Sequence, residues 1–322
     1  MTLLYKKKIF VIGGAGFIGS NFLNIKVPEY SDYFFINIDA LTYAGSLNNL
    51  TVEDFANYRF EKVDIRNLSE LELLFKKYEP TDVINFAAES HVDASILSPH
   101  IFIETNVLGA HNLLFLSKQF GVRRFHQIST DEVYGALSMS EPSFREDTPL
   151  SPTSPYSASK AAADHIVLSY HKTFGLNTVI TRCSNNFGPR QDKTKFMPKF
   201  IISLLSGEKA PLYAKGENVR DWIYVDDHVE AIDKAFHFGK SGEIYNVGGN
   251  TEKTNLEIAR TLLGLAGKDE SYIEYVKDRP GHDFRYAIDS AKIKKELGWE
   301  PRISFEEGVR KTWKYYKDKT VV

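Results

Sequence analysis

The stretch Gly13-Gly14-Ala15-Gly16-Phe17-Ile18-Gly19 follows a short apolar run and precedes a segment with the pattern of a helix. Glycines at its first, fourth and seventh positions, placed between a strand and a helix, are typical of a dinucleotide-binding turn. The first permits the tight turn, the second lets a pyrophosphate approach the backbone, and the third lets the helix pack on the strand. The sequence therefore predicts a cofactor site at Gly13, Gly16 and Gly19.

Outward from this turn, short apolar runs alternate with amphipathic stretches, which predicts strand–helix–strand units and a parallel sheet. The regular alternation stops after Arg182. We expect an α/β fold, a Rossmann-type doubly wound parallel sheet with a smaller, discontinuous α/β substrate-binding domain. The expected strands are Lys8–Gly13, Phe34–Asp39, Arg59–Lys62, Asp82–Phe86, Phe125–Ser129 and Thr178–Arg182, and the expected helices are Phe17–Ile25, Leu68–Lys77, Phe102–Phe120 and Ser157–Phe174.

Asp39 ends the second expected strand. A carboxylate there accepts hydrogen bonds from the adenosine ribose hydroxyls and repels a 2′-phosphate. No Arg or Lys lies between Asp39 and Asn49 to neutralise such a phosphate, so the cofactor is expected to be NAD rather than NADP. Ligands of these sheets bind at the carboxyl ends of the strands, which adds Asp64, Ile65, Phe86, Ala87 and Ala88 to the expected cofactor contacts. Asp64 alone is equally well explained as a turn residue.

Tyr156 and Lys160 are the one credible pair among three occurrences of the spacing Tyr-x-x-x-Lys. Tyr58 begins an expected strand, where a spacing of four does not bring side chains together, and Tyr315 lies in the C-terminal tail. Tyr156 follows Pro155 at the start of an expected helix, so Lys160 lies one turn along on the same face. Because a nearby ammonium lowers the pKa of a phenol, we expect Tyr156 to act as a base near neutral pH.

Two adjacent carboxylates, Asp131 and Glu132, follow the expected strand Phe125–Ser129. Acidic residues commonly occupy loops after strands, but these two lie at the same sheet edge as the glycine turn, beside the Thr130 hydroxyl. Two carboxylates in one cleft tend to have separated pKa values, which supplies an acid and a base together. A simple dehydrogenase needs the Tyr and the Lys but has no use for this pair. The sequence therefore predicts an alcohol oxidation combined with an elimination.

The composition excludes several classes of function. A net charge of −2 gives no reason to expect nucleic acid or an anionic membrane as a partner. The single cysteine, Cys183, excludes a disulfide framework, and His91, His126 and His282 show no metal-ligand spacing, so no metal is expected. The apolar run Ile9–Ile12 is too short for a signal peptide, and no run approaches the roughly 20 apolar residues of a membrane helix. We expect a cytoplasmic protein.

Further motifs extend the pattern over nearly the whole chain. They are Asp39–Gly45, Ala87–Asp93, Thr105–Val107, Ser129–Gly135, Ser184–Pro189, Val219–Trp222 and Asp278–His282. With the glycine turn and the Tyr156/Lys160 pair, they closely resemble the extended short-chain dehydrogenase/reductase family and, within it, the dTDP-glucose 4,6-dehydratases. The triplet Thr130-Asp131-Glu132 separates this group from sugar epimerases and decarboxylases of the same fold. Three positions, Ala40, Ala94 and Arg190, depart from the usual pattern of the group.

The resemblance implies a hydro-lyase that converts dTDP-glucose to dTDP-4-keto-6-deoxyglucose with NAD, in deoxysugar or rhamnose-type nucleotide-sugar biosynthesis. Tyr156 would take the proton of the C4 hydroxyl, which Thr130 holds, while hydride passes from C4 to NAD. Glu132 would then remove the C5 proton and Asp131 would protonate the departing C6 hydroxyl. The hydride would finally return to C6 as C5 is reprotonated, so that NAD is regenerated.

The resemblance also assigns binding residues. For NAD it adds Phe17, Ile18, Thr42, Ser90, Thr105 and Asn186, together with Tyr156 and Lys160. For the nucleotide sugar it implies Ser90, Thr130, Asn185, Lys195, Phe196, Pro198, Phe200, Pro211, Tyr213, Arg220, Asn255, Arg279 and His282. Arg220 and Arg279 are expected to grip the diphosphate, because guanidinium groups suit bidentate phosphate contacts. We expect residues 1–184 and about 217–240 to form the NAD-binding domain, and about 185–216 and 241–322 the nucleotide-sugar-binding domain.

Other functions remain open from the sequence. A dehydratase of UDP- or CDP-glucose would use the same residues, whereas an epimerase or decarboxylase of nucleotide sugars leaves Asp131 and Glu132 unexplained. A nucleotide-sensing regulator is a different class, but such proteins typically lose the catalytic Tyr or Lys. We also expect a homodimer in which Phe102–Phe120 and Ser157–Phe174 pair across a two-fold axis. Their apolar residues are Val107, Leu108, Leu113, Leu114, Leu116, Ile166, Val167, Leu168 and Tyr170; the alternative is that both helices only cover their own sheet.

Overall fold

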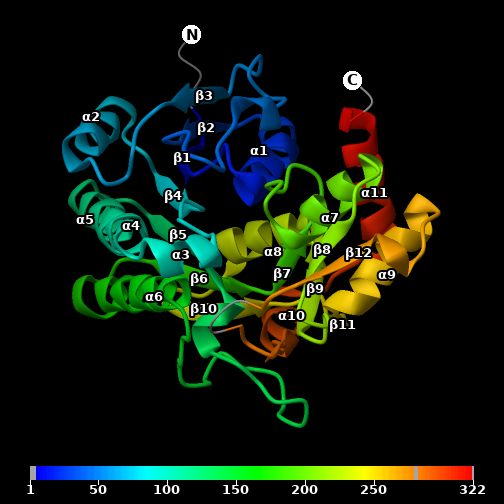
Figure 1. Ribbon diagram of the computed structural model, residues 1–322. Helices are drawn as coiled ribbons and strands as arrows, with labels where there is room; N and C mark the ends of the chain where they lie inside the picture. The colour runs from blue at the N-terminus through cyan, green and yellow to red at the C-terminus, as the bar shows by residue number, and fades with distance from the viewer. Residues whose placement is uncertain (1–4, 279–281, 321–322) are drawn as a thin grey trace.

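Seven parallel strands form the central sheet of the protein (Figure 1). The computed structural model describes residues 5–278 and 282–320. In spatial order the strands are β10 (Glu243–Val247), β6 (Thr178–Cys183), β5 (Arg124–Thr130), β4 (Asp82–Asn85), β1 (Lys7–Ile12), β2 (Tyr33–Ile38) and β3 (Tyr58–Glu61). The six expected strands lie within one residue of their expected ends. The strand order reverses between β1 and β4, and such a switch point opens a ligand crevice at the carboxyl ends of the strands. The predicted Rossmann-type fold is confirmed.

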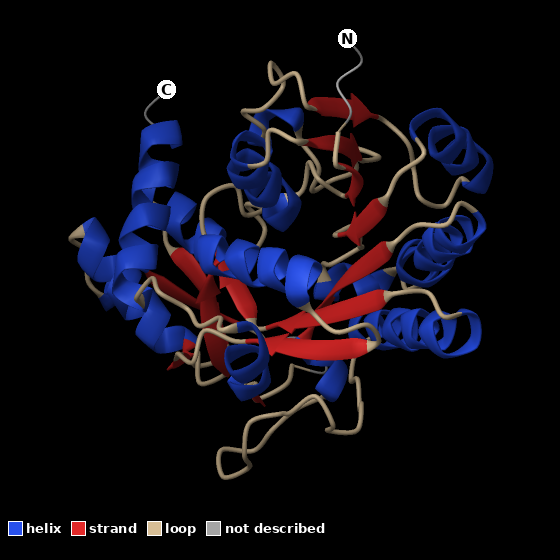
Figure 2. Ribbon diagram, turned by 180° about the vertical axis from the view of Figure 1, so that it is seen from behind, coloured by secondary structure: helices blue, strands red, loops and turns tan. Residues whose placement is uncertain are grey.

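Helices cover both faces of this sheet, which explains why its strands are apolar on both sides (Figures 1 and 2). One face packs on α1 (Phe17–Glu29) and α8 (Val225–Phe238). The other face packs on α2 (Leu68–Tyr78), α5 (Ala110–Gln119) and α6 (Pro155–Phe174). The sheet is therefore the middle of three layers, and the loops at its carboxyl edge remain free to form a site.

The expected helix Phe102–Phe120 is not a uniform α-helix. It consists of the short helix α4 (His100–Phe102), the π-helical segment η2 (Ile103–Gly109) and then α5. A π-turn inserts a residue into the helical ladder and frequently occurs at functional sites. Here it carries Asn106, whose amide oxygen accepts from Glu89 N at 2.8 Å and whose Nδ2 donates to Ser159 Oγ at 2.8 Å.

A smaller lobe lies beyond the carboxyl edge. A four-stranded sheet contains β11 (Glu252–Thr254), β9 (Val219–Tyr224), β13 (Arg285–Tyr286) and β7 (Asn185–Phe187), with β9 paired to the other three. A second, two-stranded sheet joins β8 (Ala210–Tyr213) to β12 (Ile273–Val276). The helices α7 (Phe196–Leu205), α9 (Asn255–Ala266) and α11 (Phe305–Thr320) enclose an aromatic-rich core with these strands. The remaining elements are α3 (Val92–Leu97), α10 (Ala291–Leu297) and the 3₁₀ turns η1 (Leu47–Asn49), η3 (Asp131–Tyr134) and η4 (Glu270–Tyr272).

Two strands lie in different sheets from those that the expected domain boundaries imply. The sequence assigns β9 to the NAD-binding domain and β10 to the other, but β9 is the centre of the small sheet. β10 pairs in parallel with β6 at the edge of the large sheet, from Glu243 opposite Val179 to Val247 opposite Cys183. Both are short, largely apolar strands, so their sequence patterns do not distinguish their partners.

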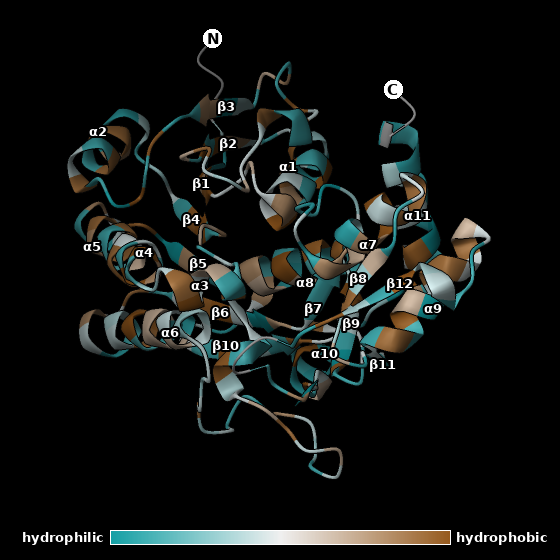
Figure 3. Ribbon diagram, viewed as in Figure 1, coloured by the Kyte–Doolittle hydropathy of each residue, from teal (hydrophilic) through white to brown (hydrophobic). Residues whose placement is uncertain are grey.

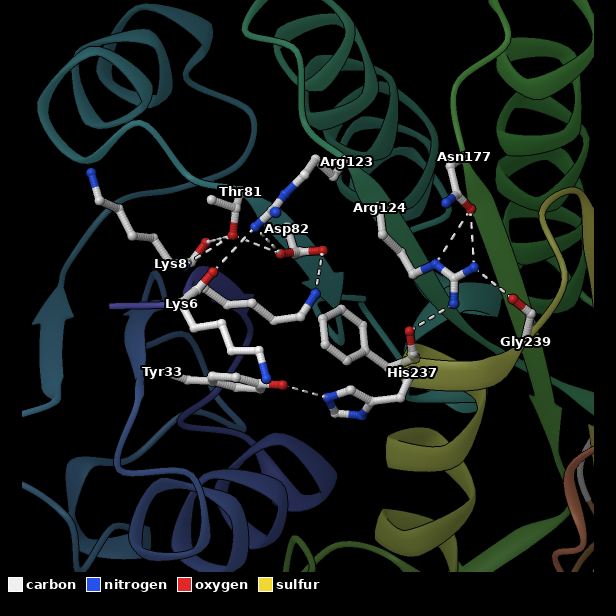
Figure 4. Close-up of polar contacts among 12 residues, drawn as sticks. Lys6, Lys8, Tyr33, Thr81, Asp82, Arg123, Arg124, Asn177, His237 and Gly239 are labelled. Carbon is white, nitrogen blue, oxygen red and sulfur yellow. Dashed lines mark hydrogen bonds and ion pairs between the residues drawn. The ribbon is translucent and has the colours of Figure 1, made fainter. Parts of the chain in front are cut away.

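Arg124, on β5, joins the carboxyl end of α8 to the large sheet (Figure 4). The last carbonyl oxygens of a helix lack intrahelical partners. The guanidinium of Arg124 donates to three carbonyl oxygens at or just after this end of α8, those of Ala235 at 3.2 Å, Phe236 at 2.7 Å and Gly239 at 2.6 Å, and the Ala235 oxygen also accepts from Gly239 N. This cap fixes the carboxyl end of α8 at the amino edge of the sheet, opposite the crevice.

Candidate active site

The turn between β1 and α1 is closely packed on one side and open on the other. Gly13 has φ +74°, and a Cβ on it would lie 2.6 Å from Ala87 N. A Cβ on Gly19 would lie 2.5 Å from Gly13 O. Gly16 differs, because a Cβ there would approach only Gly13 O, at 3.3 Å. The first and third glycines thus permit backbone packing, whereas the second leaves room for a ligand at the amino end of α1.

Asp39 lies at the end of β2, held by two backbone amides. Its Oδ2 accepts from Ala15 N at 3.0 Å and its Oδ1 from Leu41 N at 2.7 Å. Burial raises the pKa of Asp39 above its usual value, while these two hydrogen bonds oppose the rise. The carboxylate is therefore fixed in place at the sheet edge, with lone pairs remaining for hydroxyl donors.

One cleft of about 310 Å³ gathers these residues and the predicted catalytic group. That volume is within the range of small-molecule sites. All of the predicted cofactor residues line it: Gly13, Gly16, Phe17, Ile18, Gly19, Asp39, Thr42, Asp64, Ile65, Phe86, Ala87, Ala88, Ser90, Thr105, Tyr156, Lys160 and Asn186. All five predicted catalytic residues, Thr130, Asp131, Glu132, Tyr156 and Lys160, also line it.

The carboxylate pair is presented by the end of β5 and the 3₁₀ turn η3. Thr130 caps this turn, since its Oγ1 accepts from Glu132 N at 3.3 Å. Asp131 is 2% exposed, and its Oδ2 has no hydrogen-bond partner among the described residues. Burial raises the pKa of Asp131 well above its usual range, and the negative charges of Glu132 and Asp221 raise it further. A buried carboxyl of this kind retains its proton at higher pH and so can act as an acid.

We expect the variant Asp131→Asn to be more stable than the wild type at neutral and alkaline pH. The unfolded pKa is about 3.9, and the folded pKa is higher, so the folded wild type loses stability as pH rises between these two values. Asparagine carries no such penalty. Thermal unfolding at about pH 8 should give a midpoint higher by a few degrees, a gain of about 1 kcal/mol or more, and the difference should shrink toward pH 4. The exposed control Asp147→Asn should show no such trend; an equal pH dependence in both variants would contradict the buried acid.

Tyr156 is placed by a well-capped helix. Ser154 and Ser157 form a reciprocal capping box at the start of α6, and Pro155 occupies its first turn. Tyr156 packs edge-on against Phe102 and is 8% exposed. Lys160, one turn later, donates from Nζ to Ile128 O at 2.7 Å. The two side chains thus enter the cleft from the same helix.

The expected lowering of the Tyr156 pKa is not found in this structure. Burial raises the pKa of Tyr156 well above its ordinary value, and the charge of Glu132 raises it further. Burial lowers the pKa of Lys160, against the opposing charge of Asp164. Helical spacing predicts only that Lys160 lies near Tyr156, whereas burial and then the charge of Glu132 dominate the pKa of the phenol. A cationic ligand beside the phenol would reverse this balance.

The predicted substrate residues are divided between the cleft and the small lobe. Ser90, Thr130, Asn185 and Lys195 line the cleft, and Lys195 Nζ donates to Ser90 O at 2.6 Å. Phe200 lies in the core of the small lobe at 0% exposure, so its side chain is not a substrate contact. Phe196, Pro198, Pro211, Tyr213, Asn255 and His282 belong to the small lobe outside the lining of this cleft. Arg279 lies outside the described residues.

Arg220 is engaged in a way that the sequence does not predict. Its Nη1 donates to Val219 O at 2.7 Å and its Nη2 to Asp283 O at 2.9 Å, while the guanidinium lies 4.3 Å from the Tyr286 ring centroid. The expected diphosphate contact therefore competes with backbone carbonyls for the same donors.

Several residues of the site were not expected from the sequence. Asn106 joins Glu89, after β4, to Ser159 on α6, and Ser159 Oγ in turn donates to Tyr156 O at 2.7 Å. His228 shares a hydrogen bond of 2.8 Å with the amide oxygen of Asn186. Polar side chains within an expected helix do not reveal such partners, because the partners come from distant segments.

Metal-binding clusters and membrane-spanning helices are both absent from the described part of the chain. Residues 5–278 and 282–320 contain no group of three or more His, Cys, Asp or Glu side chains arranged to hold a metal ion. Within the same ranges no helix combines the length and the apolar character needed to cross a membrane.

Comparison with known proteins identifies the family. A family model described as GDP-mannose 4,6 dehydratase matches residues 10–312. The dTDP-glucose 4,6-dehydratase of Haemophilus influenzae is 46% identical, over 96% of this chain and 97% of that protein. This chain belongs to the dTDP-glucose 4,6-dehydratase family.

Solved structures of dTDP-glucose 4,6-dehydratases have the same fold as this chain over nearly the whole length of both. The enzyme from Bacillus anthracis, solved in complex with NAD, is 47% identical with a TM-score of 0.91, and 98% of each chain is covered. The enzyme from Streptomyces venezuelae, solved with NAD and TYD bound, is 43% identical with a TM-score of 0.93, again over 98% of each chain. The resemblance expected from the sequence motifs is confirmed.

Proposed function

We propose that this protein dehydrates dTDP-glucose to dTDP-4-keto-6-deoxyglucose with NAD, as a hydro-lyase. The observation that carries the proposal is the buried Asp131, with its free Oδ2, beside Glu132 in the cleft that also holds Tyr156. Oxidation of an alcohol needs only a base such as Tyr156, whereas loss of water needs an additional acid and base. The proposal includes a cytoplasmic location and a role in deoxysugar or rhamnose-type nucleotide-sugar biosynthesis.

The residues of the cleft fit NAD. The open side of Gly16 leaves room for a pyrophosphate at the amino end of α1. Asp39 can accept from the hydroxyls of an adenosine ribose, and a 2′-phosphate there would face a buried carboxylate. When bound, NAD supplies a cationic ring that accepts a hydride from C4 of the sugar and returns it to C6.

The chain's own groups divide the proton transfers among them. Tyr156 would take the C4 hydroxyl proton while Thr130 holds that oxygen. The C4 ketone then acidifies the C5 proton, which Glu132 would remove. Asp131, whose pKa burial raises well above its usual range, would donate a proton to the departing C6 hydroxyl, so that water leaves. The groups for these proton transfers thus line the same cleft, and a cationic cofactor ring beside Tyr156 would lower the pKa of its phenol so that it can act as the base.

Two related reactions are less well supported. An epimerase or decarboxylase would need no acid beside Glu132, so it leaves the buried Asp131 in the cleft without a role. A 4,6-dehydratase of UDP- or CDP-glucose would use the same residues, so the base of the nucleotide is decided by experiment.

We expect the purified protein to convert dTDP-glucose without added cofactor. The returned hydride regenerates NAD within each cycle, so bound cofactor need not be released. The test incubates the protein with dTDP-, UDP- or CDP-glucose and follows the absorbance of the 4-keto-6-deoxy product in base. Mass analysis of acid-denatured protein should identify the bound cofactor as NAD. A faster reaction with UDP- or CDP-glucose, or equal use of NADP, would contradict the proposed substrate or the interpretation of Asp39.

We also propose a homodimer, on partly different residues from those expected. Leu113, Leu114, Leu116 and Val167 are buried against the protein's own sheet, so they are not available to a partner. Other apolar side chains on the same segments face outward: Ile103, Leu108, Phe115 and Phe174 are each between 42% and 51% exposed. Figure 3 shows hydrophobic positions on α5 and α6, which lie side by side at one edge of the molecule. A two-fold axis there would bury this face against the same face of a second copy of the chain.

The variant Phe115→Lys is expected to convert a dimer to a monomer. A charge in the centre of an apolar two-fold contact is introduced twice and is left unpaired. Light scattering at micromolar concentration should give about twice 36.6 kDa for the wild type and a single-chain mass for the variant. Leu73→Lys is the matched control, since Leu73 is also exposed but lies on α2. A wild-type mass of one chain would contradict the dimer.

A further inference from the structure

The proposed acid–base groups come from two elements that are separate in sequence. Asp131 and Glu132 belong to η3, whereas Tyr156 and Lys160 belong to α6. A long connection, residues 135–154, lies between them. Dehydration requires both sets to reach the same sugar, and displacement by about 1 Å is enough to reduce catalysis about a hundredfold. The two elements therefore need a direct link that fixes their separation.

Arg182 on β6 pairs with α6. Its Nε donates to Asp164 Oδ2 at 2.9 Å, and both side chains are buried, with exposed fractions of 2% and 0%. Asp164 follows Lys160 by one turn and Tyr156 by two, so the three lie along one face of the helix. An ion pair buried on both sides holds α6 at a fixed height over the sheet, because removing either partner leaves an uncompensated charge.

The same guanidinium contacts η3. Its central carbon lies 4.8 Å from the ring centroid of Tyr134, the last residue of that turn. Tyr134 is 2% exposed, and its hydroxyl donates to Asn246 Oδ1 at 2.8 Å. The ring also stacks on Phe144, with ring centroids 5.1 Å apart. Tyr134 is thus held by contacts with Arg182, Asn246 and Phe144, and Arg182 contacts both η3 and α6.

We propose that Arg182 is a positioning residue that holds η3 and α6 in register, so that Asp131 and Glu132 face the sugar bound by Tyr156. This inference rests on the proposed dehydration. The planar guanidinium suits the task, because such a group can pair with a carboxylate and contact an aromatic ring at the same time. Lysine at this position keeps the charge but has no planar face. The contact with Tyr134 therefore distinguishes a positioning role from simple neutralisation of Asp164.

The test separates oxidation from elimination in the holoenzyme. Each protein is mixed with dTDP-glucose, and two signals are recorded: the absorbance of reduced nicotinamide, and the 4-keto-6-deoxy product in base. In Arg182→Lys, Tyr156 and Lys160 keep their place on α6, so oxidation continues. We expect product formation to fall about ten- to a hundredfold, while reduced nicotinamide accumulates above the wild-type level.

A second variant reaches the same link from its other end. Tyr134→Leu removes the ring but keeps the Arg182–Asp164 pair, and it should show the same loss of product with the same accumulation. Because both changes break one contact, the double variant should be no slower than the slower single variant, whereas independent effects would multiply. Fully multiplicative effects in the double variant would overturn the inference.

Lys26→Met is the matched control for a general loss of stability. Lys26 is 1% exposed and pairs with Glu29 and Glu230, at 2.8 and 2.7 Å, between α1 and α8. Its removal also disturbs a buried ion pair, here between α1 and α8, but touches neither η3 nor α6, so the ratio of the two signals should equal that of the wild type. If the ratio of reduced nicotinamide to product in Arg182→Lys equalled the ratio in Lys26→Met, the inference about Arg182 would be overturned and the proposed function would stand. Wild-type protein that forms no product from dTDP-glucose would overturn the proposed function as well.

Discussion

Glu132→Gln is expected to stop the formation of the 4-keto-6-deoxy product while oxidation at C4 continues. The amide is nearly isosteric with the carboxylate but cannot accept the C5 proton. Loss of a general base costs about 10²- to 10⁴-fold, and here it removes the step on which water loss depends. Product formation should therefore fall to the limit of detection, with reduced nicotinamide appearing on addition of dTDP-glucose. Exchange of the C5 proton with deuterium in the solvent should also stop.

The control for this substitution is Glu141→Gln, an exposed position in the connection between η3 and α6. Its turnover should stay within about twofold of the wild type, as is usual for surface changes of well under 0.5 kcal/mol. Wild-type turnover in Glu132→Gln would show that Glu132 is not the base of the elimination. An epimerase would then explain the residues of the cleft better than a dehydratase.

Tyr156→Phe is expected to slow the whole cycle by at least about a hundredfold. The change removes one hydroxyl from a side chain that is 8% exposed, so the packing against Phe102 is retained. Unlike Glu132→Gln, it acts before the ketone forms, so reduced nicotinamide should not accumulate. Stopped-flow absorbance after mixing with dTDP-glucose distinguishes the two patterns directly.

Tyr170→Phe provides the matched control, because Tyr170 is also buried on α6 but lies outside the cleft. Its rate should match the wild type. Rapid accumulation of reduced nicotinamide in Tyr156→Phe would show that another group takes the C4 proton. Burial raises the pKa of the Tyr156 phenol, and a cationic cofactor ring beside it would lower that pKa. The wild-type rate should therefore increase with pH up to the pKa of the phenol beside the bound cofactor.

Local patterns predicted the central sheet and its cleft well, for a physical reason. A parallel sheet covered on both faces requires continuous apolar runs, and runs such as Ile9–Ile12 can be recognised in the sequence itself. The carboxyl ends of these runs converge at one edge, so Asp39, Thr130 and the glycine turn could be placed in one site from chain order alone. Tyr156 and Lys160 were recognisable because their spacing is that of one helical turn.

Features that depend on distant partners were not predictable in this way. Whether β10 joins β6 or the small sheet depends on pairing energies that its own five residues do not encode. The π-turn at η2 is stabilised by Asn106, whose partners Glu89 and Ser159 come from either side of it in sequence. The pKa of Tyr156 likewise depends on Glu132, which lies 24 positions earlier but faces the same cavity.

β9 belongs to the small sheet and β10 to the large sheet, and this placement limits how substrate preference can change. The chain passes from the large sheet into the small lobe after β6, returns with α8 and β10, and leaves again with β11. Neither lobe is a continuous segment, so no single cut excises one intact, and a continuous segment transplanted from a relative would not carry a complete lobe. Limited proteolysis should therefore release no stable lobe, and heating should melt both lobes in one transition. A change of nucleotide specificity in this architecture has to arise through individual substitutions along the cleft.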